Sequence, residues 1–167
     1  MEKTLMARAI AFAREIKELT GCEPEELREV IPVLMPCLMS GGEIDHTAHL
    51  GGSEWRFIDM GYDREGVDYA EGILAEEMSS DAYGVGGFNA DFIASHSDLS
   101  LEIVEALQEG EKFEALGQYL IDNDCVTGPH GMAADCARAD GLGHHFAHYD
   151  GETHELNSEG FYGFNLG

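Results

Sequence analysis

Apolar residues recur at steps of three and four through the first twenty positions. One side of a helix with this spacing would carry Leu5, Ala9, Phe12, Ile16 and Leu19. Gly21 follows the last of them and is a natural helix end. The pattern therefore predicts an amphipathic helix over about residues 1–20.

A second helix is expected to begin at Glu23-Pro24, because proline suits the first helical position and acids suit the first turn. Pro32 and Pro36 are expected to interrupt this helix. Residues 40–53 are rich in glycine and indicate a loop, and residues 55–58 indicate a short strand.

Helical spacing returns from Val67 and continues to Ile121, with a turn at 82–87 and a stop at Gly110. Ser100 is a suitable N-cap for a helix over residues 101–108. Five or six helices are thus expected before residue 122.

The pattern changes near the C-terminus. Asp150-Gly151 separates two runs, 144–149 and 152–156, and this dipeptide favours a β-hairpin turn. Residues 161–164 would add a third strand. We therefore predict an α+β fold in one domain over 1–167, with a mostly helical body over 1–121 and a C-terminal β-hairpin region over 139–167.

The charge changes this picture most. The chain holds 33 Asp and Glu against 9 Lys and Arg, a formal net charge of −24 in 167 residues. The apolar fraction of 44% is ordinary for a globular protein, so the chain is not an acidic disordered tail. So much negative charge opposes binding to nucleic acid or anionic lipid and favours a basic partner.

More than half of the excess lies in residues 60–124, where 16 acids accompany only Arg64 and Lys112. Glu102, Glu105 and Glu109 share one face of the predicted helix there. Their carboxylates would recur about every 5 Å, against about 3.4 Å for the phosphates of one DNA strand. The residues expected to contact a basic partner are Asp68, Glu71, Glu76, Glu77, Glu102, Glu105, Glu109, Glu111 and Glu114.

Histidines and cysteines in the tail leave a metal site open as an alternative. A diagonal pair of His145 and His154 in the predicted hairpin, together with a carboxylate, would suit zinc. So would Cys125, His130 and Cys136 with a hairpin histidine as the fourth ligand, although neither spacing matches a defined zinc motif. Cys125 or Cys136 could also act as a nucleophile with His130 as its base, but the sequence alone does not show whether they meet. We expect no catalytic residue and no cofactor. The alternative is a bound zinc ion.

The first residues lack the apolar run of a signal peptide, and no stretch approaches the length of a membrane span. The four cysteines, which form no C-x-x-C pair, are accordingly expected to be reduced thiols. The sequence thus predicts a cytoplasmic protein.

Two segments, 83–94 (YGVGGFNADFIA) and 139–151 (ADGLGHHFAHYDG), are similar to segments of short uncharacterised proteins of phages and prophages. The resemblance implies a small accessory protein of a mobile element acting in the host cytoplasm. Such elements encode acidic anti-restriction and anti-CRISPR inhibitors that imitate DNA, and this chain resembles that class by charge and context.

We therefore expect a DNA mimic that blocks the nucleic-acid site of a CRISPR surveillance complex or restriction enzyme through protein–protein contacts. Two alternatives stay open: a zinc module or metal-dependent enzyme that uses the tail, and an ordinary domain of a halophile, whose charge is screened by salt.

Overall fold

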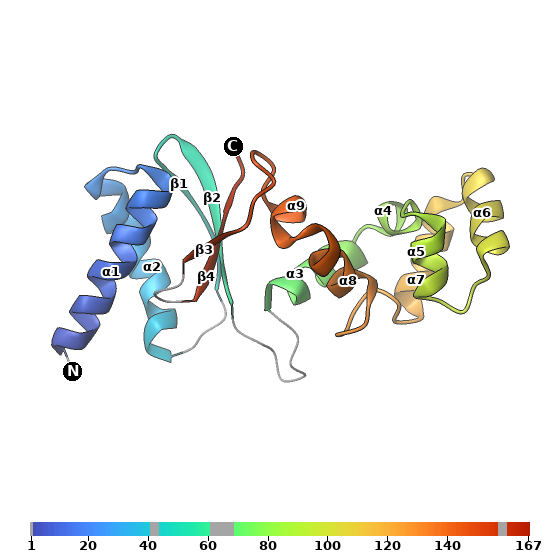
Figure 1. Ribbon diagram of the computed structural model, residues 1–167, viewed down its shortest axis with the longest axis horizontal. Coiled ribbons are helices and arrows are strands. Elements are labelled where there is room, and N and C mark those ends of the chain that lie inside the picture. The colour runs from blue at the N-terminus through green and yellow to red at the C-terminus, as the bar shows by residue number, and fades with distance from the viewer. Residues whose placement is uncertain (1, 41–43, 61–68, 157–159) are drawn as a thin grey trace. The chain divides into compact units, whose positions relative to one another are not determined.

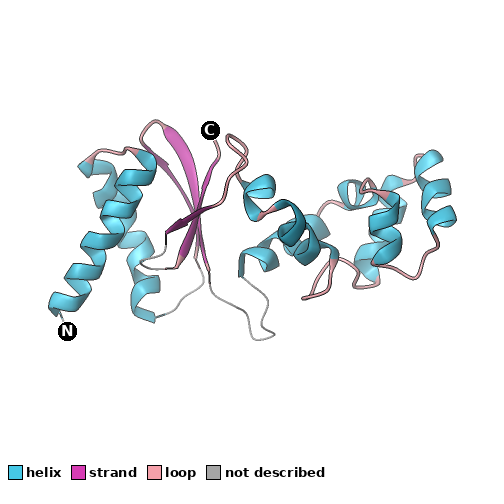
Figure 2. Cartoon of the chain, viewed as in Figure 1, coloured by secondary structure: helices cyan, strands magenta, loops and turns pink. Residues whose placement is uncertain are grey.

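The computed structural model describes residues 2–40, 44–60, 69–156 and 160–167. These residues group in two compact units, although the sequence suggested one domain. Unit 1 holds 2–40, 44–60, 69–70 and the C-terminal residues from 140, and unit 2 holds 71–139. Figure 1 gives the order of the elements, and Figure 2 shows that the described strands all belong to unit 1. The predicted α+β class is confirmed.

Unit 1 is a sheet with two helices on one face. Its helices are α1 (Glu2–Thr20) and α2 (Pro24–Ser40), and its strands are β1 (Asp45–Leu50), β2 (Ser53–Asp59), β3 (His154–Leu156) and β4 (Phe161–Asn165). The strands pair antiparallel in the order β1-β2-β4-β3, so the two ends of the chain supply adjacent strands.

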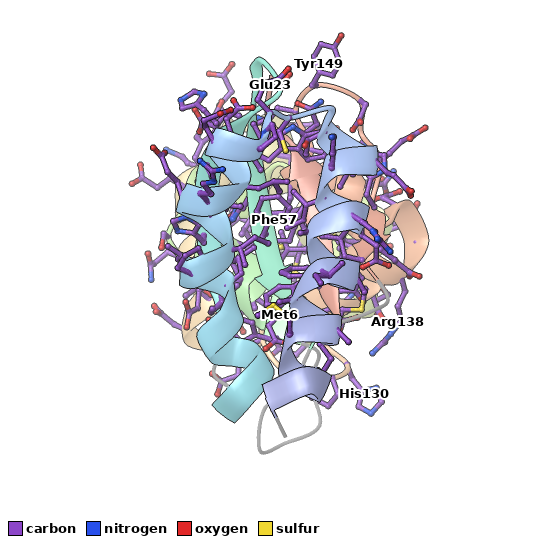
Figure 3. The ribbon with its side chains drawn as sticks, turned by 90° about the vertical axis from the view of Figure 1, so that its left-hand side faces the viewer. Met6, Glu23, Phe57, His130, Arg138 and Tyr149 are labelled. Atoms are coloured by element: carbon purple, nitrogen blue, oxygen red, sulfur yellow. The ribbon has the colours of Figure 1, made fainter. Side chains whose placement is uncertain are left out.

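The core of unit 1 lies between the sheet and helices α1 and α2. Phe12 and Ile16 of α1 are fully buried, which confirms the predicted apolar stripe. Phe57 of β2 meets them from the sheet and lies between the two helices in Figure 3. Phe161 of β4 stacks on Phe12 with ring centroids 5.4 Å apart.

Helix α9 (Leu142–Phe146) covers part of the opposite face of the sheet. Phe146 packs on Phe164 of β4 at 5.2 Å, and the guanidinium of Arg56 lies 4.7 Å from the centre of the Phe146 ring. Arg56 also donates two hydrogen bonds, of 2.8 and 2.7 Å, to the carboxylate of Asp45 on β1. Stacking and bidentate pairing together fix this arginine between the strands and the helix.

Two local predictions for the N-terminal part of unit 1 are wrong. Helix α2 continues through Pro32 and Pro36 instead of stopping. Within the stretch expected to be a loop, residues 45–50 form β1, and Gly51-Gly52, both with positive φ, make the turn into β2. A Cβ on Gly51 would overlap the carbonyl oxygen of Thr20, so glycine is required where this turn meets α1.

The predicted hairpin around Asp150-Gly151 is also wrong, because residues 142–146 are helix α9 and β3 pairs with β4 instead. Two contacts of Gly143 with residues 152–153 explain the helix. The backbone N–H of Gly143 donates to Thr153 Oγ1 at 2.6 Å, and a Cβ on Gly143 would overlap the backbone of Glu152. Packing thus brings the start of α9 against residues 152–153. The predicted third strand is present as β4.

Unit 2 is helical in its described part. It contains α4 (Ala82–Gly86), α5 (Ala90–Ser95), α6 (Leu101–Glu109), α7 (Phe113–Asp122) and most of α3 (Tyr69–Ser79) and α8 (Met132–Asp140). Ser100 caps α6 by accepting a hydrogen bond from the N–H of Ile103, as the sequence predicted. Val104, Leu116 and Leu120 are buried and contribute to its core.

Two glycines allow α4 and α7 to approach each other closely. A Cβ on Gly117 of α7 would overlap the carbonyl of Ala82, and a Cβ on Gly86 of α4 would overlap the carbonyl of Phe113. The backbones therefore meet without intervening side chains.

Among the described residues, every helix is too short or too polar to span a lipid bilayer.

Candidate interaction surface and neighbouring pocket

The described part of unit 2 carries a large excess of carboxylates. Residues 71–139 contain 14 Asp and Glu against two bases, Lys112 and Arg138, a formal net charge of −12 with histidines neutral. Twelve of these acids are exposed, and only Glu71 and Asp135 are half-buried. Since Arg138 is paired with Asp135 at 3.0 Å, little positive charge offsets the exposed carboxylates.

Helix α6 presents the most regular part of this charge. Its exposed side carries Glu102, Glu105 and Glu109, which we call the α6 carboxylate row, and Val104 is buried on the inward side. The row extends over about 10 Å of helix axis. Exposed Ile103 lies beside it, with half of its surface accessible to solvent.

The other predicted contact residues that the structure describes lie on α3, directly after α6 and on α7. Glu111 follows α6 with a left-handed backbone, φ 54°, and Glu114 is in the first turn of α7; both are exposed. Glu76 and Glu77 are exposed on α3, whereas Glu71 of the same helix is half-buried. Asp68 lies outside the described residues. Seven of the nine predicted residues are therefore accessible to a partner.

Sequence reasoning missed a polar pocket in unit 2. It is an open cavity of about 660 Å³ lined by Ser95, His96, Ser97, Asp98, Asn123, Cys125, His130 and Asp135. Cys125 and His130 were candidates, but His96 and Asp135 are far apart in the sequence and carried no motif. The contact between α5 and α8 that joins them is tertiary.

His96 is held at both ring nitrogens. Nδ1 lies 2.8 Å from the carbonyl oxygen of Phe92, and Nε2 lies 2.5 Å from Asp135 Oδ2. Both neighbours are acceptors, and only a tenth of the His96 side chain is exposed. The hydrogen bond from His96 holds the pKa of Asp135 below its usual value, and Arg138 adds to the effect.

Ser95, His96 and Asp135 resemble a catalytic triad only superficially. The Ser95 hydroxyl is 3.0 Å from Nδ1, but it donates to the Phe92 carbonyl at 2.8 Å. The serine proton is therefore directed at the Phe92 carbonyl and not at Nδ1, as a catalytic triad would require. The arrangement is therefore suited to fixing α5 against α8, and not to general-base catalysis.

Cys125 is poorly placed for nucleophilic chemistry. Burial raises the pKa of its thiol, and the carboxylates of Asp98 and Asp124 raise it further. The thiolate is the reactive form of cysteine, and this environment disfavours it.

The predicted zinc ligands are not brought together. Among the described residues, Cys125, His130 and Cys136 do not form a group whose ligand atoms converge. Cys136 is buried on α8, while Cys125 and His130 line the open pocket. His145 lies on α9 instead of a strand, so it does not form the predicted diagonal pair with His154. The converging group that does occur contains His154 with two acids absent from the prediction, Asp150 and Glu152.

No family model, curated protein or solved structure matches this chain.

The pairing of His96 with Asp135 predicts a pH-dependent contribution to the stability of unit 2. Since the pKa of Asp135 is lowered on folding, this contribution is present above the unfolded carboxyl pKa of about 3.9 and is lost as pH falls through the lower folded value. Asp135→Asn should cost about 1–3 kcal/mol at pH 7, because a largely buried imidazole loses a charged partner.

Urea unfolding at pH 7, 5 and 3 measures this effect. The difference between wild type and Asp135→Asn should shrink as pH falls below about 4, because the unfolded carboxyl takes up a proton there while the folded one does so only at lower pH. Glu105→Gln, which removes an exposed charge, is the matched control and should change stability little. Equal differences for Asp135→Asn at all three pH values would contradict the role given to this pair.

Proposed function

We propose that this chain is a non-catalytic inhibitor whose unit 2 occupies the nucleic-acid site of a basic bacterial defence protein. The observation that carries the proposal is the exposure of twelve carboxylates in the described part of unit 2, with two bases to offset them. Lysines and arginines that hold a phosphate backbone recognise charge and spacing, so they can also bind ordered carboxylates.

Two further features support a macromolecular partner. The α6 carboxylate row is built on a helix capped by Ser100, so its spacing is set before binding. Exposed apolar residues accompany the acids: Tyr83 is 63% exposed and Ile103 is 50% exposed. Such side chains supply the desolvated contacts that carry energy at protein interfaces, while the charges set orientation and association rate.

The proposed target is a CRISPR surveillance complex or a restriction enzyme, and the proposed compartment is the host cytoplasm. The purified chain should inhibit DNA binding by its target in competition with DNA. It should not bind DNA itself, because both molecules are strongly negative.

The experiment is a panel of purified restriction enzymes and CRISPR complexes, assayed for DNA binding with increasing amounts of the chain. Inhibition should be relieved by excess DNA and should weaken steeply from 50 to 500 mM salt, conditions chosen to span about a Debye length of 14 to 4 Å. Inhibition that is insensitive to both DNA and salt would contradict mimicry. Unfolding of the chain at low salt would favour a halophilic domain instead.

A further inference from the structure

Unit 1 contains a group of metal-ligating side chains that the proposed inhibitory function does not use. Asp150, Glu152 and His154 alternate along the segment that enters β3, and each offers a ligand atom within 4.8 Å of the other two. His154 Nε2 lies 3.0 Å from Asp150 Oδ2 and 3.9 Å from Glu152 Oε2. The group is thus one imidazole nitrogen facing two carboxylates.

The chemistry of this group is more selective than that of a set of acids. An imidazole favours zinc and other transition ions, while the carboxylates also suit manganese. Magnesium and calcium prefer oxygen ligands alone, so they gain little from His154. Three protein ligands leave further positions for water or another ligand.

The surroundings give room for these additional ligands. An open hollow of about 470 Å³ lies beside His154, between α1 and β3, and Glu15, Glu18 and Glu155 also line it. These acids increase the negative potential around the group and favour a cation over an anion there.

A separate observation comes from Trp55. Its indole ring packs edge-on against the His154 ring at 5.7 Å and is 4% exposed. The buried Nε1–H has no hydrogen-bond partner in the described part of the chain, which is costly for a polar group. Water ordered by an ion at His154 would be an acceptor near this orphaned donor.

We propose that Asp150, Glu152 and His154 form a binding site for one divalent transition-metal ion, Zn²⁺ or Mn²⁺. The ion would join the segment after α9 to β3 and so stabilise the edge of the sheet.

The test is titration of the purified full chain with Zn²⁺ and with Mn²⁺, followed by calorimetry and by Trp55 fluorescence with Co²⁺ as a quenching probe. Trp55 is the only tryptophan in the chain, so its emission reports on this location. One ion should bind per chain, and millimolar Mg²⁺, which occupies the diffuse acidic surface, should not displace it. Co²⁺ should quench the emission in a saturable way.

Variants locate the site. Glu152→Gln changes a side chain that is 70% exposed, so it should leave the fold intact and weaken binding about tenfold or more, as should His154→Ala. Glu25→Gln removes an exposed charge from α2, and His130→Ala removes an exposed histidine of unit 2; both should bind as wild type.

Absence of saturable binding below millimolar ion would overturn the proposal. So would binding that survives Glu152→Gln and His154→Ala but is lost in His130→Ala, which would place the ion in unit 2. Neither result bears on inhibition by unit 2, which is measured separately.

Discussion

Replacing Gly117 by alanine is expected to destabilise unit 2 by about 3 kcal/mol or more, because the new methyl group has no space. Its Cβ would overlap the backbone carbonyl of Ala82, and backbone cannot rotate away as a flexible side chain can. The helices α4 and α7 would have to separate, which would loosen the packing around Leu116 and Leu120. Gly86→Ala should act in the same way through Phe113.

The matched control is Gly72→Ala in helix α3. A Cβ at Gly72 meets no atom within 4 Å, so this change should stabilise the helix by up to about 1 kcal/mol. Urea unfolding measures both variants, and hydrogen exchange of the α4 and α7 amides shows whether the loss is confined to unit 2. If Gly117→Ala were as stable as Gly72→Ala, the close packing of these helices would be refuted.

Reversing the whole α6 carboxylate row is expected to abolish inhibition. Each exposed ion pair contributes up to about 1 kcal/mol, so loss of Glu102, Glu105 and Glu109 should weaken binding about a hundredfold. Changing all three to lysine adds repulsion from the basic partner. A single reversal should weaken binding by no more than about fivefold, because the effect is distributed over many charges.

A control with the same change in net charge separates a specific surface from overall acidity. Glu18, Glu25 and Glu29 are exposed on α1 and α2 of unit 1, and their triple replacement by lysine also adds six charges. Competition with DNA for the inhibited complex measures both triple variants, with circular dichroism to confirm folding. Equal loss in the two variants would mean that net charge alone, and not the α6 row, accounts for binding.

The sequence was enough to predict the helices whose formation depends on interactions between residues a few positions apart. The apolar stripe containing Phe12 and Ile16 predicted α1, and Ser100 with its following apolar residues predicted α6. Helix periodicity also placed Glu102, Glu105 and Glu109 on one exposed side. These predictions hold because helical spacing and capping act within a few residues.

Predictions failed where a distant segment decided the local structure. The run from His144 has the pattern of a strand, but burial of Phe146 against Phe164 and close approach of Gly143 to the 152–153 backbone produce α9 instead. Strand β1 gains its hydrogen bonds from β2, and β2 in turn pairs with β4 from the end of the chain. A strand has no hydrogen bonds of its own, so its existence depends on the partner that it finds.

The sequence by itself determined the excess of carboxylates, its concentration in the middle of the chain and the helices that display it. Only the tertiary structure decided which titratable groups meet: His96 with Asp135, and His154 with Asp150 and Glu152. Charge and helical period are properties of neighbouring residues, whereas a polar pair between α5 and α8, or a turn before β3, depends on backbone paths that packing sets.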